Sequence, residues 1–412
     1  MHIVTASSDC TVRIWNTATG LCEEELQHSD SVYSAMFSPD GMHVVSASDT
    51  VQIWNSATGK CEASLRGHKF EIYLVAFSPD GMHIVSAAED DTARIWNMTT
   101  RQPEMELQGH SGYVNSAVFS PDGMHVVSVS EDKTAIWNTV TRVCEIELKG
   151  DIICPKFSPD GKHIISKSAS DHTAHIWNTA TGVCEAELKG HTSQIIMVVF
   201  SSDSRHIVTA SHDKTARIWT VTGECEAELK GHTDGVRSAV FSPNGMHIVT
   251  ASFDKSARIW NTVTGECEAV LKGHTDVVMS AAFSLNDMHI ATVSVDKSAR
   301  IWNTLTGECE AELKGHTESV YSVIFSTYGL HIVTANYHTA WIWNTVTKEC
   351  EAELNLLYMS ENTQFSATGV FIRDFGGDEG ICLSLQSSFL DTYEDTTVPL
   401  RPDVQITHHG RS

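Results

Sequence analysis

Residues 231–261 read GHTDGVRSAVFSPNGMHIVTASFDKSARIWN, and this stretch decides the fold. The runs VRSAVFS and MHIVTAS alternate apolar and polar residues and are joined at 243–245 by Pro-Asn-Gly, a tight-turn signal. SARIWN follows the short link Phe253-Asp254-Lys255, and ECEAVLK follows the turn that ends in Gly265. Each run is rich in β-branched or aromatic residues, and none has the apolar period of a helix. The stretch therefore predicts four antiparallel strands in chain order, a unit called a blade below.

The blade recurs along the chain. Its tryptophans stand about 40 residues apart, and a fixed period of this length indicates a unit that buries its faces by stacking on its neighbours. Nine of them are followed by Asn or Thr: Trp15, Trp54, Trp96, Trp137, Trp177, Trp219, Trp260, Trp302 and Trp343. Full repeats span residues 27–354, and a partial repeat precedes them. The sequence therefore predicts an all-β propeller of eight full four-stranded blades plus a partial first blade, closed as a ring of eight or nine.

Each repeat also carries a fixed polar set. A Gly-His pair opens the repeat about 28 residues before the Trp, an Asp stands six residues before the Trp in most copies, and a Ser or Thr stands four residues before that Asp. Four repeats carry the whole set at this spacing: His68, Ser86, Asp90 and Trp96; His191, Thr209, Asp213 and Trp219; His232, Thr250, Asp254 and Trp260; and His274, Thr292, Asp296 and Trp302. This spacing is highly specific and resembles the WD-repeat β-propeller family over residues 1–354, with Asn where the family usually has Asp after the Trp.

The hydroxyl, imidazole and carboxylate of this set also suggest a hydrolase, so two interpretations compete. A catalytic triad occurs once per active site and needs an exposed nucleophile and an oxyanion hole. Here the set recurs in six blades, which favours architecture. The indole N–H can donate to the hydroxyl, the hydroxyl to the imidazole, and the other ring nitrogen to the carboxylate. The family resemblance implies the same blade-stabilising network, and the protein is predicted not to be an enzyme.

The copies differ from one another at three slots: the residue before the network Asp, and the third and fifth residues after the His. In a propeller these slots lie on connections at one face, around the mouth of the channel. Their side chains are of types enriched at protein interfaces; relaxed constraint on exposed loops is the competing explanation. The predicted binding residues are Tyr33, Tyr73, Glu89, Tyr113, Glu131, Ile196, His212, Arg237, Phe253, Met279 and Tyr321. The expected partner is a protein or a peptide.

Composition and charge restrict the other classes of function. The net charge of −24 disfavours nucleic acid, because affinity for phosphate backbones comes mainly from clustered Lys and Arg. No apolar run approaches the roughly 18 residues of a membrane span. The eleven cysteines are widely spaced without a C-x-x-C pair, which indicates free thiols in a reducing, cytoplasmic compartment. No metal or other cofactor is expected, and the His that opens each second strand is interpreted as a surface residue.

Some repeats depart from the pattern. In LKGDIICPKFSPDG, Asp151 replaces the His and about three residues are missing, so this blade is expected to lose a network member and part of its inner strand. In TANYHTAWIWN the Asp is absent, and Trp341 takes the slot where five other copies have Arg. Before Trp54 and Trp137 the Asp stands five residues away, which predicts shortened turns or third strands in those blades.

The first repeat lacks its innermost strand, since Met1 aligns with the Met of GMHIV inside a hairpin. Either the residues after 354 supply this strand, or the chain is a fragment whose start lies upstream. The fragment is favoured, because mobile ends tolerate loss whereas a missing central strand exposes an edge. Residues 355–412 contain no Trp and no Gly-His pair. They are predicted to form a non-repeat tail or a degenerate blade, with GVFIRDF and GICLSLQ as candidate strands.

The near-identical repeats and their variable slots are also similar to the WD-repeat arrays of fungal vegetative-incompatibility proteins. In that class the array follows a NACHT-type NTPase and acts as the recognition domain. The resemblance implies that this chain is the sensor part of such a protein. A non-functional gene fragment is another hypothesis, and a propeller hydrolase is less favoured because it needs a convergent cluster of carboxylates or His. The sequence does not indicate an oligomeric state.

Overall fold

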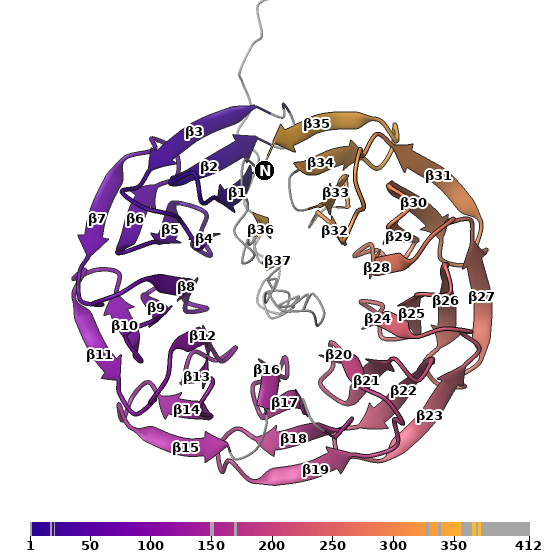
Figure 1. The fold of residues 1–412 in the computed structure, drawn as a ribbon, viewed down its shortest axis with the longest axis horizontal. Coiled ribbons are helices and arrows are strands. Elements are labelled where there is room, and N and C mark those ends of the chain that lie inside the picture. The colour runs from indigo at the N-terminus through magenta and orange to yellow at the C-terminus, as the bar shows by residue number, and fades with distance from the viewer. Residues whose placement is uncertain are drawn as a thin grey trace, which may run out of the picture.

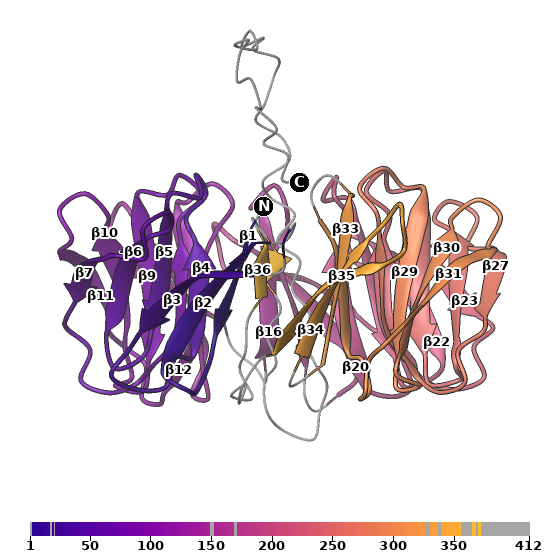
Figure 2. The ribbon, with the colours of Figure 1, turned by 90° about the horizontal axis from the view of Figure 1, so that it is seen from above.

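The computed structural model describes residues 2–16, 19, 21–148, 152–168, 171–326, 329–336, 339–355, 365–367 and 370–371. In this part of the chain nine antiparallel sheets stand side by side in a ring, and each sheet forms one blade (Figure 1). The predicted β-propeller is confirmed, and of the two predicted sizes the ring has nine blades. Seen edge-on, the strands run between two faces of the ring, where the connections gather (Figure 2).

Blades 2 to 9 are four-stranded meanders in which consecutive strands pair antiparallel. Their innermost strands are β4 (Ser34–Phe37), β8 (Ile72–Phe77), β12 (Val114–Phe119), β16 (Ile152–Phe157), β20 (Ile195–Phe200), β24 (Val236–Phe241), β28 (Val278–Phe283) and β32 (Ser322–Phe325). The second strands, with that of blade 1 first, are β1 (His2–Ala6), β5 (His43–Ala47), β9 (His83–Ala88), β13 (His125–Ser130), β17 (His163–Ser168), β21 (His206–Ser211), β25 (His247–Ser252), β29 (His289–Ser294) and β33 (His331–Ala335).

The outer half of each blade has the same order. The third strands are β2 (Thr11–Asn16), β6 (Val51–Asn55), β10 (Ala93–Asn97), β14 (Thr134–Asn138), β18 (Ala174–Asn178), β22 (Thr215–Thr220), β26 (Ser256–Asn261), β30 (Ser298–Asn303) and β34 (Thr339–Asn344). The outermost strands are β3 (Cys22–Gln27), β7 (Cys61–Leu65), β11 (Pro103–Leu107), β15 (Cys144–Leu148), β19 (Cys184–Leu188), β23 (Cys225–Lys230), β27 (Cys267–Lys272), β31 (Cys309–Lys314) and β35 (Cys350–Asn355).

Local chemistry explains the first hairpin of a blade. In blade 7 the N–H of Gly245 donates to the carbonyl of Ser242 over 2.8 Å, and the Ser242 hydroxyl donates to the side chain of Asn244, also over 2.8 Å. Gly245 has a φ of 70°, which glycine adopts without the steric cost that a Cβ brings. The predicted turn at 243–245 therefore joins β24 to β25 as expected.

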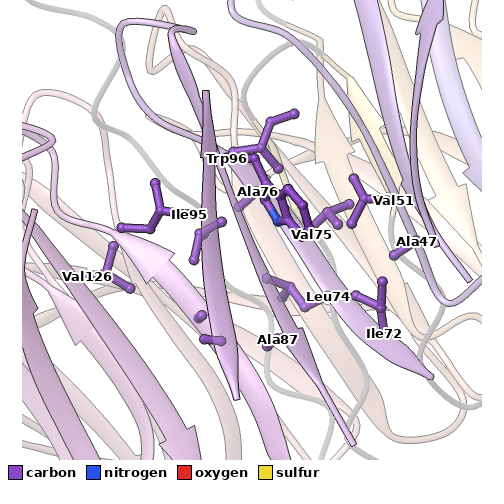
Figure 3. Packing of buried hydrophobic residues seen from close by; sticks show 14 of the residues in the cluster. Ala47, Val51, Ile72, Leu74, Val75, Ala76, Ala87, Ile95, Trp96 and Val126 are labelled. Atoms are coloured by element: carbon purple, nitrogen blue, oxygen red, sulfur yellow. The ribbon is translucent and has the colours of Figure 1, made fainter. Parts of the chain in front are cut away.

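The blades pack on one another through apolar side chains. In the cluster of Figure 3, Ile72, Val75 and Trp96 of blade 3 lie with Val51 of blade 2 and Val126 of blade 4. The Trp96 side chain is 1% exposed. Because every sheet has a neighbour on both faces, the second strands are buried at nearly every position, whereas the outermost strand of blade 7 is mostly exposed and buries only Leu271. Stacking around the ring therefore forms the core.

Blade 1 obtains its innermost strand from the end of the described chain. β1 pairs antiparallel with β36 (Phe365–Ala367), and β36 pairs with β37 (Val370–Phe371). Of the two alternatives stated above, the less favoured one describes this pairing, because residues after 354 cover the edge of β1. The candidate strand GVFIRDF overlaps β37, whereas GICLSLQ lies outside the described residues.

The ring closes through side chains on both faces of β1. Ile3 packs with Ile324 and Ile342 of blade 9. On the other face, Val4 packs with Ala35 of blade 2. Blade 1 thus packs against a neighbouring blade on each of its two faces, as the other blades do, and the ring is closed at this point.

One expectation about the irregular repeats is wrong. The inner strand of blade 5, β16, has six residues, the same length as β20 in blade 6. The missing residues therefore shorten the connection before the strand, because the ladder with β17 retains the strand itself. Asp151 lies outside the described residues. The third strands β6 and β14 have five residues, which agrees with the predicted shortening, although β10 and β18 are equally short.

Candidate functional site

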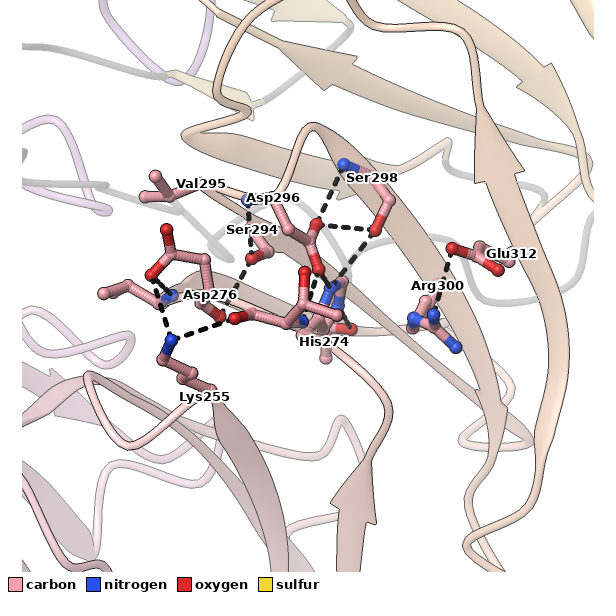
Figure 4. Close-up of polar contacts among 12 residues, drawn as sticks. Lys255, His274, Asp276, Ser294, Val295, Asp296, Ser298, Arg300 and Glu312 are labelled. Atoms are coloured by element: carbon pink, nitrogen blue, oxygen red, sulfur yellow. Dashed lines mark hydrogen bonds and ion pairs between the residues drawn. The ribbon is translucent and has the colours of Figure 1, made fainter.

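The recurring polar set forms a chain of hydrogen bonds, and Figure 4 shows the part of this chain in blade 8 that joins His274, Asp296 and Ser298. The indole N–H of Trp302 donates to the Thr292 hydroxyl over 2.8 Å, and this hydroxyl lies 2.9 Å from Nε2 of His274. Nδ1 of His274 lies 2.9 Å from the Asp296 carboxylate, which also accepts from the Ser298 hydroxyl over 2.7 Å. The chain therefore pairs buried donors and acceptors that would otherwise each cost about 1–3 kcal/mol.

The same chain is complete in four other blades of the described structure. Its members there are His68, Ser86, Asp90 and Trp96; His110, Ser128, Asp132 and Trp137; His191, Thr209, Asp213 and Trp219; and His232, Thr250, Asp254 and Trp260. All four sets selected in the sequence are thus brought together. Blade 4 joins them although its Asp stands one residue closer to the Trp.

The network carboxylates are held ionised. Burial opposes the ionisation of Asp254, but the carboxylate accepts hydrogen bonds from Nδ1 of His232, from the Ser256 hydroxyl and from the backbone N–H of Thr233. These bonds outweigh burial and hold the pKa of Asp254 well below its usual range. Each complete network therefore contains a carboxylate at neutral pH.

The imidazoles and hydroxyls of the network are closed to solvent. Burial lowers the pKa of His274, against the attraction of Asp296. Thr250 and Thr292 are 0% exposed. A nucleophile must contact its substrate, so a hydroxyl enclosed in this way stabilises the blade and does not serve as a catalytic group.

Two other blades hold an imidazole without a direct carboxylate contact. In blade 9, Nε2 of His316 lies 2.7 Å from the Thr334 hydroxyl, and Nδ1 has no hydrogen-bond partner among the described residues. In blade 2, Nδ1 of His28 lies 3.2 Å from the Ser48 hydroxyl, which donates to Asp49. Burial lowers the pKa of His316 to about 4 and that of His28 to about 4.

Blades 1 and 5 retain the indole bond of the network and the hydroxyl bond to the Asp, but show no network imidazole among their described residues. Trp15 donates to the Thr5 hydroxyl over 2.9 Å, and Trp177 donates to the Ser166 hydroxyl over 2.9 Å. With no network imidazole in the described part of either blade, the carboxylate in the Asp slot contacts other groups. In blade 1, Asp9 forms an ion pair with Arg13 at 2.9 Å.

The variable slots lie on two connections that run beside each other in each blade. In blade 3 the backbone N–H of Glu89, between β9 and β10, donates to the carbonyl of Glu71, between β7 and β8, over 2.9 Å. In blade 7, Phe253 donates in the same way to Gly235 over 3.0 Å. These backbone bonds hold the slots of one blade next to each other.

Five side chains from blades 2 to 4 interact on this face and are called the tyrosine cluster: Tyr33, Tyr73, Tyr113, Glu71 and Glu89. The Tyr33 hydroxyl donates to Glu71 over 2.6 Å, and the Tyr33 and Tyr73 rings meet edge to face at 5.9 Å and 82°. Burial, followed by the charges of Glu89 and Glu71 and the nearby Tyr113, raises the pKa of Tyr73 to about 12. Tyr113 is 49% exposed. The cluster therefore joins aromatic rings and negative charge at one place.

The other predicted binding residues are more scattered. The rings of His212 and Phe253, from blades 6 and 7, stack at 5.5 Å and 27°. Arg237 and Met279 are half-buried in β24 and β28. Ile196, in β20, is 8% exposed, so its side chain offers little surface to a partner and its assignment as a contact residue is not supported.

Two further predicted residues lie on connections of blades 4 and 9. Glu131 is exposed between β13 and β14, and Tyr321 is half-buried just before β32. Sequence reasoning did not select Lys167, which is 8% exposed and donates from Nζ to the Ile196 carbonyl over 3.3 Å. The sequence could have pointed to Lys167, because the run HIISKS has Lys where the corresponding run HIVTAS of blade 6 has Ala210. Glu71 stands in the variable slot three residues after His68 but is not among the predicted binding residues, because only the fold places it beside Tyr33.

The His that opens each second strand has a fixed partner. In blade 7, Nε2 of His247 lies 3.2 Å from Glu268 of the outermost strand, whose other oxygen accepts from the Asn261 amide over 2.9 Å. The same His–Glu pair occurs in every blade of the described structure.

The ten cysteines in the described residues form no disulfide, and Cys382 lies outside these residues.

Nine sheets of one repeated plan, most with the same internal polar network, define a β-propeller built from one type of blade. A family model described as "WD domain, G-beta repeat" matches residues 1–16, 20–55, 59–97, 101–138, 142–178, 182–220, 223–261, 265–303 and 307–344. The chain belongs to this WD-repeat family. Propellers of the family generally act as non-catalytic scaffolds that bind proteins or peptides.

Similarity to solved structures supports the same fold. The crystal structure of the computationally designed Ika8 protein matches with a TM-score of 0.59 and 25% sequence identity, over 78% of this chain and 98% of that chain. No curated protein matches the chain. The described residues contain no helix long and apolar enough to cross a bilayer.

Proposed function

We propose that the chain is a non-catalytic recognition module that binds a protein or peptide on the face carrying the variable slots, with the tyrosine cluster as its main contact. The tyrosine cluster carries this proposal. Three adjacent blades with nearly the same framework place three phenol rings and two carboxylates together on one face. Tyr is enriched in the energetically dominant part of interfaces, because it presents a large rigid apolar ring with a polar end.

The partner that fits this chemistry is a segment rich in Lys or Arg. A cation lies favourably over an aromatic ring, and the carboxylates of Glu71 and Glu89 add charge-assisted hydrogen bonds. The raised pKa of Tyr73 keeps its phenol protonated, so the charge of the cluster comes from the glutamates. The net charge of −24 also attracts a basic partner from a distance.

An array of short immobilised peptides that differ only in their Lys and Arg content tests the proposal. Binding of the labelled chain is expected to rise with basic content. Tyr73→Ala is expected to weaken this binding about thirtyfold, since truncating a central interface aromatic costs about 2 kcal/mol. The matched control is Val263→Ala, at an exposed residue between β26 and β27 that is not among the predicted binding residues, and it is expected to leave binding to basic peptides unchanged.

Two results would contradict the proposal. Equal binding of acidic and basic peptides would exclude a basic partner. An unchanged affinity in Tyr73→Ala, with circular dichroism showing a folded chain, would exclude the tyrosine cluster as the contact.

We also propose that the module is the recognition domain of a larger cytoplasmic protein of the fungal vegetative-incompatibility class, with a NACHT-type NTPase upstream. The internal variation supports this: the framework barely changes between repeats, whereas the face slots range from Glu89 to Phe253. Full-length transcript sequencing across the 5′ end of the coding region tests it. The expected frame continues upstream into an NTPase; a transcript whose reading frame begins at Met1 would contradict the proposal.

A further inference from the structure

Blade 5 gathers three side chains that can ligate a metal. Asp171 precedes β18, His175 lies within β18, and Glu187 lies in β19. Their candidate ligand atoms all lie within 4.8 Å of one another. β18 and β19 are paired so that His175 stands directly opposite Glu187. The neighbouring Trp177 ring, 5.8 Å from the imidazole, limits the positions that the half-buried His175 can take.

The corresponding carboxylates of blade 1 show what this arrangement attracts. There Arg13 lies between Asp9 and Glu25, at 2.9 Å from one and 3.0 Å from the other. Arg13 stands opposite Glu25 in the pairing of β2 with β3, the same relation as His175 to Glu187. Neither blade has, among its described residues, the network imidazole that binds the Asp elsewhere. Two neighbouring carboxylates therefore hold a cation in blade 1.

Blade 5 has replaced its permanent cations by imidazoles. The run DHTAH at 171–175 stands where blade 6 has DKTAR, so His172 and His175 take the places of Lys214 and Arg217. A neutral imidazole brings no charge to balance Asp171 and Glu187, but its ring nitrogen is a metal ligand, which a guanidinium is not. The substitution thus replaces a position that holds an Arg side chain by one where a metal cation can bind.

We propose that Asp171, His175 and Glu187 form a site for a divalent transition-metal ion such as Zn²⁺. One imidazole nitrogen and two carboxylate oxygens are a ligand set that Zn²⁺ accepts, with a fourth position left to water. Bonds of about 2.0–2.2 Å place tetrahedral ligands roughly 3.4 Å apart, so the exposed carboxylates must approach the imidazole slightly. The ion takes the place that the Arg13 guanidinium has in blade 1 and stabilises a blade without a network imidazole.

Two existing contacts bear on this site. Nζ of Lys189 lies 2.7 Å from Glu187, and its side chain is 70% exposed, so it can turn into solvent when a divalent ion binds. The Thr173 hydroxyl donates to one oxygen of Asp171 over 2.6 Å, which orients the carboxylate.

Calorimetric titration of the whole chain with ZnCl₂ tests the proposal. The thiols are first alkylated with iodoacetamide, because the exposed Cys184 on β19 would itself bind zinc. The unchanged chain is expected to show a site that His175→Ala weakens by about tenfold or more. The matched control is His163→Ala, which removes the imidazole of the His163–Glu185 pair in the same blade and leaves the titration unchanged. Arg13→His is expected to add one equivalent of binding, through Asp9 and Glu25.

Each outcome decides the proposal. Bound zinc is expected to raise the unfolding temperature of the unchanged chain and not that of His175→Ala. If His175→Ala does not fold, Asp171→Asn combined with Glu187→Gln gives the same test at two exposed positions. Identical titrations of the unchanged chain and of these variants would overturn the proposal, since the binding would then come from other groups.

Discussion

Thr250→Val is expected to lower the free energy of unfolding by about 3 kcal/mol, because it leaves two buried polar groups without a partner. The Thr250 hydroxyl accepts from the indole N–H of Trp260 over 2.8 Å and lies 2.7 Å from Nε2 of His232. Valine has nearly the same shape, so the change removes hydrogen bonds without opening a cavity. Urea unfolding followed by circular dichroism measures the effect.

Two further variants separate the hydrogen bonds from packing. Thr250→Ser keeps the hydroxyl and is expected to cost about 1 kcal/mol, the value of one buried methyl group. In a Trp260→Phe background, which lacks the indole donor, Thr250→Val is expected to cost less than in the unchanged chain. Equal losses in Thr250→Ser and Thr250→Val would show that packing, and not the network, explains the cost.

Lowering the pH from 7 to 5 is expected to destabilise the propeller, with the largest part coming from the two imidazoles that have no direct carboxylate contact. Burial lowers the pKa of His316 to about 4, whereas an unfolded chain gives about 6.5. The unfolded state therefore binds the proton first, so the stability contributed by the neutral imidazole is complete above about pH 6.5 and falls until about pH 4. At pH 5 the loss is about 2 kcal/mol for His316. The similarly buried His28 adds to it in the same direction.

The network carboxylates titrate in a different window. The pKa of Asp213 and that of Asp254 are lowered by their hydrogen bonds against the effect of burial, so the stability that these groups add is lost only below about pH 4. Urea unfolding of His316→Gln at pH 7 and pH 5 is expected to show a pH-dependent loss about 2 kcal/mol smaller than in the unchanged chain. Trp341→Phe alters packing on the same imidazole, 4.8 Å away, and keeps the full loss. An undiminished loss in His316→Gln would assign the pH dependence to other groups.

The parts of the molecule that follow local rules could be predicted. β24 and β25 occupy the runs VRSAVFS and MHIVTAS, because alternation and a tight turn act over a few residues. Members of the polar network could be predicted because the same spacing along paired strands puts each residue at the equivalent position of every blade. The prediction for the inner strand of blade 5 is wrong. The missing residues were expected to shorten β16, but pairing with β17 retains the whole strand, and the connection before it is shorter instead.

The candidate sites depend on contacts that spacing along the chain does not reveal. Tyr33 of blade 2 meets Glu71 of blade 3, and the Ile196 side chain is 8% exposed in the folded chain. The internal repeats identified the variable slots, but they carried no information about which of these slots lie close together. Asp171 and Glu187 likewise become neighbours only when β18 pairs with β19.

The sequence by itself determined the repeated blade, its strands and the residues of its polar network. These follow from alternation, turn chemistry and a constant spacing, all of which act within one repeat. Only the tertiary structure decided that the ring has nine blades, that β36 covers the edge of β1, that the tyrosine cluster forms, and that Asp171, His175 and Glu187 come together. The physical reason is that closure of the ring, pairing across distant segments and the balance of neighbouring charges depend on distances between residues that are far apart in the chain.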